Sequence, residues 1–253
     1  NPEIISSDAE IPAVLRKHEL QKVMIVTDAG IRKLGLTSFL EKTLAEEGIG
    51  YCIYDRTVAN PTIWNVEEAK DLYLKEGAQA LIAFGGGSSM DCAKAAGARI
   101  VKPRQSIRQM KGLLKVHKKL PLLIAIPTTA GTGSETTLAA VITDSEKHYK
   151  YPINDFSLIP RYAVLDYHET VGLPKSITAT TGMDALTHAV EAYIGGSTTR
   201  ETRKMAEKAV YLVHQYLKRA YDNGHDKEAR KGMLKAAYYA GVAFTKSDRK
   251  SVV

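Results

Sequence analysis

The amino-acid sequence predicts an α/β domain built on a parallel sheet, followed by a domain made only of helices. Short β-branched apolar segments alternate with segments of helical periodicity over the first two thirds of the chain, which is typical of a parallel sheet covered by helices. Loops rich in glycine or threonine directly follow two of the apolar segments. Beyond Asp166 the strand pattern does not recur. We therefore expect two domains, over residues 1–166 and 167–253.

The predicted elements follow one another as β-α-β units. A strand over residues 22–28 is followed by a helix over 31–48, which ends at a glycine, and by a second strand over 49–54. A helix is then expected at 65–76, and further strands at 80–87, 120–127, 141–144 and 162–166. The rest of the chain is expected to form helices, at 176–193, 200–221 and 226–244.

The composition is typical of a globular protein outside the membrane. Hydrophobic residues make up 44% of the chain and charged residues 25%, and the longest apolar run, Leu120–Pro127, is too short to span a bilayer. The first residues contain neither a basic segment nor an apolar core, so we expect no signal peptide and a cytoplasmic location. Cys52 and Cys92 form no CxxC motif and are expected to be buried thiols.

The net charge of +7 is concentrated between Lys102 and Lys119. Such a charge attracts a polyanionic partner or small anionic ligands. The segment has no aromatic residues on which bases could stack and no recognisable nucleic-acid-binding motif. We therefore interpret it as a solvated basic face and expect no nucleic-acid partner.

A core helix is predicted over residues 180–193, TTGMDALTHAVEAY. Alanine, leucine, valine and glutamate favour a helix. Four apolar residues recur at steps of three and four, which predicts that they form the buried face: Met183, Leu186, Ala189 and Val190.

On this helix Asp184 and His188 are four residues apart, so both side chains project from the same face. A carboxylate and an imidazole suit a borderline divalent ion such as iron(II) or zinc, and two further ligands would have to come from elsewhere. The alternative is an ordinary acid and histidine pair with no metal role.

The loop FGGGSSMDCAKA, residues 84–95, joins a predicted strand to a predicted helix. Its glycines allow close approach of a ligand to the backbone, and the free amides at the helix start favour an anion such as pyrophosphate. The loop matches neither GxGxxG nor GxxxxGK[ST]. It is therefore a candidate phosphate site, with a glycine turn needed only for packing as the alternative.

The loop PTTAGTGSETT, residues 127–137, also follows an apolar strand. Its amides and hydroxyls are suited to phosphate and nicotinamide groups at the carboxyl edge of an open sheet; the alternative is a threonine-rich turn whose hydroxyls bind their own backbone. Asp28, at the end of the first strand, is suited to ribose hydroxyls and favours NAD over NADP. It is equally suited to capping a helix.

Taken together, five segments resemble the iron-containing (group III) alcohol dehydrogenases, in the superfamily that also holds glycerol dehydrogenase and dehydroquinate synthase. The resemblance implies a Rossmann-like N-terminal domain, an all-α C-terminal domain and a metal in the cleft between them. It also implies reversible hydride transfer between NAD(H) and a small primary alcohol or aldehyde. The matching segments are VTD at 26–28, NPT at 60–62, GGGSSMDCAK at 85–94, PTTAGTGSE at 127–135 and TGMDALTHAVEAY at 181–193.

The resemblance also implies roles for individual residues. Two of the four metal ligands, for Fe2+ or Zn2+, would be Asp184 and His188, and the protein would form a homodimer or larger assembly. The cofactor-binding positions would be Asp28, Asn60, Gly86, Gly87, Ser88, Asp91, Thr128, Thr129, Thr132, Thr137 and Lys150.

The sequence departs from the family pattern in the helical domain. The family's other two metal ligands are histidines beyond the stretch that matches AGVAFTK, and this chain matches neither, nor does it match the histidine that the family uses in proton transfer. We expect the residues to be part of a longer enzyme whose helical domain is incomplete here. The alternatives are a truncated module that binds nucleotide or assembles without redox chemistry, and a member resembling glycerol dehydrogenase or dehydroquinate synthase.

Overall fold

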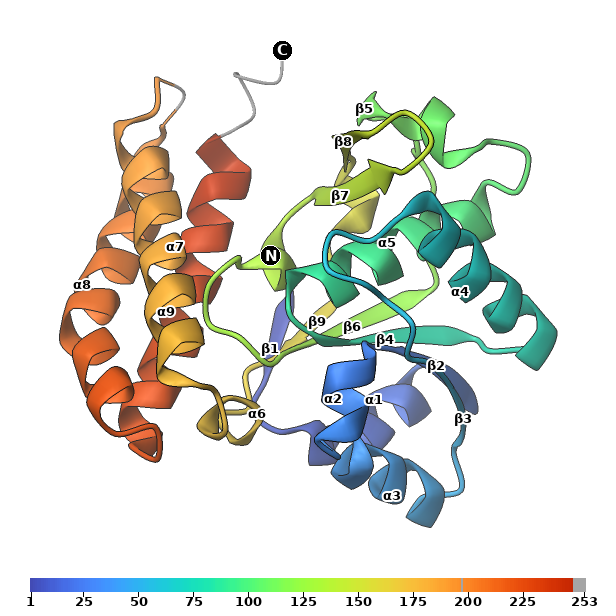
Figure 1. The fold of residues 1–253 in the computed structure, drawn as a ribbon, viewed down its shortest axis with the longest axis horizontal. Coiled ribbons are helices and arrows are strands. Elements are labelled where there is room, and N and C mark those ends of the chain that lie inside the picture. Colours follow the sequence, from blue (N-terminus) through green and yellow to red (C-terminus); the bar gives the residue numbers. More distant parts are fainter. Residues whose placement is uncertain (197, 248–253) are drawn as a thin grey trace. The chain divides into compact units, whose positions relative to one another are not determined.

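The computed structural model describes residues 1–196 and 198–247, which form two compact units (Figure 1). The sheet unit consists of residues 2–126 and 138–164, and the helical unit consists of residues 127–137 and the chain from Leu165 onward, with Asn1. The change of unit at Leu165 lies beside the boundary expected near Asp166. Residues 127–137, however, were expected in the first domain and pack instead within the helical unit, for reasons given with the candidate site.

A six-stranded sheet forms the centre of the sheet unit, with the strand order β1-β9-β6-β4-β2-β3. The pairs β2–β3, β2–β4, β6–β9 and β1–β9 are all parallel. In the register of β2, Val26 lies opposite Tyr54 on one side and Ala83 on the other. The strands are β1 (Glu3–Ile5), β2 (Lys22–Val26), β3 (Gly50–Tyr54), β4 (Ala80–Gly85), β6 (Leu122–Pro127) and β9 (Tyr162–Val164).

Helices cover both faces of this sheet, as the sequence predicts. Alternate residues of β2 point to opposite faces: Met24 and Val26 pack in one buried cluster with α4 and α5, whereas Val23 and Ile25 pack in another with α1 and α3. Both clusters are apolar, which explains the continuous hydrophobic run of the strand. The helices are α1 (Ile11–Lys17), α2 (Ala29–Lys33), α3 (Ser38–Glu46), α4 (Ile63–Glu76) and α5 (Gly87–Val101).

One local prediction for the sheet unit was wrong. The helix expected over 31–48 is divided into α2 and α3, because Gly35 adopts a φ of 70° in the turn between them. The strand expected at 141–144 is confirmed as part of β7 (Ala139–Asp144), which lies outside the parallel sheet. It pairs antiparallel with β8 (Tyr149–Asn154) in a separate sheet of order β5-β8-β7, where β5 is Gly112–Leu113.

The helical unit contains α6 (His168–Val171), α7 (Lys175–Ile194), α8 (Arg200–Asp222) and α9 (Lys227–Ser247). The predicted buried face of α7 was right for Ala189 and wrong for Met183 and Val190, which are 52% and 42% exposed. The buried face instead consists of small residues, Thr178, Gly182, Ala185, Ala189 and Ala192. They let α7 approach its neighbours closely: a Cβ at Gly182 would lie 2.3 Å from Leu217 of α8. Of the described helices, none combines the length and the apolar character needed to cross a bilayer.

Candidate active site

The glycine loop after β4 leaves the start of α5 open to a ligand. Gly85 has a φ of 148°, and a Cβ there would lie 2.6 Å from the Ser89 hydroxyl oxygen, so the turn requires glycine. Gly86 is the N-cap residue of α5, and no side chain caps the helix. The first amides of this 15-residue helix are therefore available to an anion, which the helix dipole also favours.

Three of the predicted cofactor residues lie together beside this turn. The backbone N–H of Asn60 donates to the Ser88 hydroxyl oxygen at 3.2 Å, and the Lys150 ammonium donates to the Asn60 side-chain oxygen at 2.7 Å. Asn60 has a φ of 58°, a left-handed conformation that asparagine tolerates better than most residues. The contacts join the segment before α4, the start of α5 and the β7–β8 hairpin, and they bring a positive charge close to the open helix start.

Asp91 and Asp28 have structural hydrogen bonds. The Asp91 carboxylate accepts a hydrogen bond from the backbone N–H of Val141 at 3.1 Å, which ties α5 to β7. Asp28 is the N-cap residue of α2, and its Oδ1 accepts from the backbone N–H of Ile31 at 2.9 Å. The helix-capping interpretation of Asp28 is thus confirmed, and its role toward a ribose stays a prediction.

The loop at residues 127–137 lies directly on α7 and α9 of the helical unit through glycines. A Cβ at Gly131 would lie 2.6 Å from the Thr181 Cβ of α7. Gly133, with a φ of 61°, contacts the backbone of Gly241 on α9, and a Cβ at Gly241 would lie 2.2 Å from the Thr136 hydroxyl oxygen. These close approaches explain why the loop packs with the helices.

The four threonines predicted to bind the cofactor belong to this loop of the helical unit. Thr128 and Thr137 are buried, and Thr129 and Thr132 are half-buried. The Thr132 hydroxyl oxygen accepts a hydrogen bond from the backbone N–H of Ser134 at 3.2 Å, so at this position the loop satisfies its own hydroxyl. The other predicted cofactor residues belong to the sheet unit.

Asp184 and His188 lie on one face of α7, as the spacing predicts. The His188 Nε2 is 3.7 Å from the Asp184 Oδ1. The His188 side chain is 25% exposed and the Asp184 side chain is 42% exposed. The imidazole packs against Phe244 of α9, with a distance of 5.0 Å between ring centroids. Its Nδ1 is buried and has no hydrogen-bond partner in the part of the chain that the structure describes. Phe244, which we did not single out from the sequence, therefore orients the imidazole by packing.

The pair fits two positions of a metal-ligand set. The His188 Nε2 and the Asp184 Oδ1 are close enough to share one ion. The Nδ1, unpartnered among the described residues, is the other nitrogen of the ring. Among residues 1–196 and 198–247, no third histidine, cysteine, aspartate or glutamate joins them in a group that could hold a metal. The described residues thus provide half of a four-ligand set.

Comparison with known proteins assigns the family. Residues 4–167 match the family model of the iron-containing alcohol dehydrogenases, and residues 178–252 match the model of the C-terminal part of this family. The chain belongs to the iron-containing alcohol dehydrogenase family. Its two matched regions meet close to the change of unit at Leu165.

Relatives in the iron-containing alcohol dehydrogenase family are longer than this chain. It is 42% identical to alcohol dehydrogenase 4 of Schizosaccharomyces pombe, over 93% of this chain and 56% of that protein. It is 40% identical to the NAD-dependent methanol dehydrogenase of Bacillus methanolicus, over 93% and 61%. The crystal structure of a 1,3-propanediol oxidoreductase matches with a TM-score of 0.93 and 32% identity, over 98% of this chain and 65% of that one. The chain thus spans about three fifths of these proteins.

Proposed function

We propose that the protein is a metal-dependent, NAD(H)-linked alcohol dehydrogenase that acts mainly as an aldehyde reductase on small substrates. The observation that carries the proposal is the open start of α5, with Lys150 held beside it, in a chain of this family. The names of the relatives, which include an alcohol dehydrogenase and an NAD-dependent methanol dehydrogenase, support the reaction class.

The sheet unit would hold the phosphates of the dinucleotide. The free amides of α5 donate hydrogen bonds to phosphate oxygens, and the glycines leave room for the ligand to approach. Lys150 adds a charge whose position is set by its hydrogen bond to Asn60. The same proposal gives cofactor-binding roles to three further groups. Asp28 would bind the ribose, and Asp91 and the threonines of residues 127–137 would be further cofactor-binding positions.

Asp184 and His188 would hold the metal, Fe2+ or Zn2+. When bound, such an ion supplies Lewis-acid chemistry at the alcohol or aldehyde oxygen. The carboxylate of Asp184 contributes negative charge, and the imidazole must be neutral at the nitrogen that binds. Phe244 packs against the imidazole and would help to orient it toward the metal.

The cellular location and the assembly are part of the same proposal. We expect a cytoplasmic homodimer or larger assembly, on the basis of the family resemblance. Light scattering coupled to size-exclusion chromatography measures the assembly, and a single species with the mass of one chain would contradict it.

The test is NADH oxidation by a small aldehyde, with Zn2+ or Fe2+ supplied. Asp184→Asn and His188→Ala are each expected to abolish turnover and to leave NADH binding nearly unchanged, because neither side chain is among the predicted cofactor-binding residues. Asp222→Asn and His214→Ala make the same chemical changes on α8, away from the candidate site, and are expected to keep turnover.

Each outcome decides between the proposal and an alternative. Near-normal turnover in either α7 variant would show that the assigned metal role is wrong. NADH binding without turnover, even with metal supplied, would favour a non-catalytic nucleotide-binding module. Oxidation of glycerol in preference to any alcohol with a single hydroxyl group would place the protein with the polyol dehydrogenases of the superfamily.

A further inference from the structure

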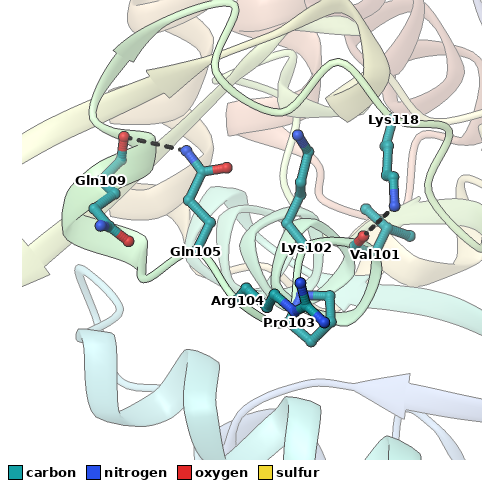
Figure 2. Close-up of a pocket in the computed structure, with 7 residues that line it drawn as sticks. All are labelled: Val101, Lys102, Pro103, Arg104, Gln105, Gln109 and Lys118. Carbon is teal, nitrogen blue, oxygen red and sulfur yellow. Dashed lines mark hydrogen bonds between the residues drawn. The ribbon is translucent and has the colours of Figure 1, made fainter.

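A pocket with a volume of about 590 Å³ lies in the sheet unit at the C-terminal end of α5 (Figure 2). Its lining comes from Val101, the last residue of α5, from the segment that follows it, and from Lys118. The volume is within the range of small-molecule sites. Because α5 has 15 residues, the pocket is about 20 Å from the open helix start, so it is separate from the proposed nucleotide site.

Three cations line this pocket, and no carboxylate does. They are Lys102, Arg104 and Lys118, and none of them forms an ion pair with any of the described residues. Arg108, in the same basic segment, differs because it pairs with Asp144 and Glu146. The charges at the pocket are therefore not paired with acidic groups. Arg108, by contrast, forms ion pairs that stabilise the fold.

The backbone of the pocket is held in place from within by Arg99. This side chain is only 11% exposed, and its Nε binds the Glu67 carboxylate at 2.5 Å. Its Nη1 donates to three backbone carbonyls of the lining segment, at 2.9 to 3.2 Å: those of Lys102, Pro103 and Gln105. The loop that carries the first two cations is therefore preorganised, which lowers the entropic cost of binding a ligand.

The negative end of α5, which by itself disfavours an anion, is partly offset here by a cation. The Lys118 ammonium donates to the carbonyl oxygen of Val101 at 3.2 Å, so a cation lies against the last carbonyl of the helix (Figure 2). On the other side of Lys102 in this view are Gln105 and Gln109. The Gln105 Nε2 donates to the backbone carbonyl of Gln109 at 3.4 Å, and the Gln109 side-chain amide adds a neutral donor. The lining thus combines positive charge with hydrogen-bond donors.

We propose that this pocket binds a small polyvalent anion carrying two or more phosphate groups. A guanidinium group binds phosphate oxygens in a bidentate manner, and the lysines act as point charges. Val101 and Pro103 supply an apolar wall for the uncharged part of such a ligand. No aromatic side chain lines the pocket, so it offers no stacking surface for bases, and a small phosphate compound fits better than single-stranded nucleic acid.

Calorimetric titration with inorganic tripolyphosphate, with and without saturating NADH, tests the proposal. With saturating NADH, which occupies the proposed α5 site, we expect one tripolyphosphate per chain, bound with an affinity that falls as salt increases. The variant Lys102→Gln/Arg104→Gln is expected to bind at least tenfold more weakly. If this double variant loses its native circular dichroism spectrum, the single variants Lys102→Gln and Arg104→Gln replace it. Each is expected to show part of the loss of tripolyphosphate affinity.

The matched control is Lys115→Gln/Lys119→Gln, which removes two charges from the same basic segment but none from the lining. It is expected to change the affinity less than twofold. Three results would overturn the proposal: no saturable binding, equal weakening in the two double variants, or loss of all tripolyphosphate binding when NADH is saturating. Tighter binding of oligouridylate than of tripolyphosphate, lost in the same variant, would instead show a nucleic-acid surface and would also overturn it.

Discussion

Asp144 is a carboxylate with no solvent exposure that remains charged because Arg108 binds it through two hydrogen bonds. The Arg108 guanidinium lowers the pKa of Asp144 to about 2, and the backbone N–H groups of Glu146 and Lys147 support the charged form. The pair joins the basic segment before β5 to the β7–β8 hairpin, so it connects two parts of the sheet unit that are far apart in the sequence.

We expect Asp144→Asn to destabilise the protein in a manner that depends on pH. In the unfolded chain the pKa of an aspartate is about 4. The stabilisation from the charged form is therefore fully present above that pH and is lost as pH falls toward 2. Urea unfolding between pH 3 and pH 7 should show a constant difference from wild type above about pH 5 and a smaller one below pH 4. A difference independent of pH would contradict the role of the charge.

Lys150 is expected to contribute to nucleotide affinity, because its hydrogen bond to Asn60 places the ammonium beside the start of α5. Lys150→Met should weaken NADH binding by about tenfold, or ~1.4 kcal/mol, and should reduce the salt dependence of binding. Fluorescence titration of NADH measures both. Lys147→Gln, in the turn of the same hairpin, removes an equal charge and serves as the control; an equal loss in the control would show only a general charge effect.

At the scale of elements, the loop at residues 127–137 illustrates how glycines decide which parts of the chain pack together. The loop begins at the end of β6, yet its backbone contacts α7 at Thr181 and α9 at Gly241. These distances leave no room for a Cβ at Gly131, Gly133 or Gly241. The contact therefore depends on glycine both in the loop and on the helix that receives it.

Gly241→Ala is expected to lower the free energy of unfolding by about 1–3 kcal/mol, the usual cost of overpacking. Alanine in a helix interior would otherwise be favoured over glycine by about 1 kcal/mol, so a net loss indicates steric conflict with Thr136. Gly172→Ala is the control, because a Cβ there has no atom within 4 Å. Urea unfolding of both variants measures the effect, and a stabilised Gly241→Ala protein would contradict the close contact.

At the scale of the whole molecule, the candidate nucleotide residues at α5 and the acid–histidine pair on α7 belong to different units. In the proposed function, the first group would bind the nucleotide through backbone amides and Lys150, and the second would offer two ligands to an ion. The two activities are therefore expected to be separable by removing the metal alone.

Chelation with EDTA should lower turnover at least 100-fold and change NADH affinity less than twofold. Added Zn2+ or Fe2+ should restore turnover. EDTA that has been saturated with Zn2+ beforehand is the control for effects of the chelator itself. An NADH affinity that falls in parallel with turnover would show that nucleotide binding also requires the metal, contrary to the assignment of the α5 site.

The sequence by itself determined features that depend on neighbouring residues. The buried run of β2, the glycine turn before α5 and the four-residue spacing of Asp184 and His188 follow from strand and helix periodicity, and each is present in the structure. Local periodicity sets which residues share a face, so these predictions needed no knowledge of distant segments.

Only the tertiary structure decided features that depend on contacts between distant residues. The exposure of Met183 and Val190 follows from which face of α7 its neighbours cover, and small residues allowed the closer approach. The packing of Phe244 on His188 and the contact of Lys150 with Asn60 join segments that are separated in the sequence. The basic segment from Lys102 was visible in the sequence, and the structure added that Lys102, Arg104 and Lys118 line one pocket. Hydrophobic periodicity cannot specify such pairs. It shows whether a residue lies on a buried or an exposed face, and not which distant residue it contacts.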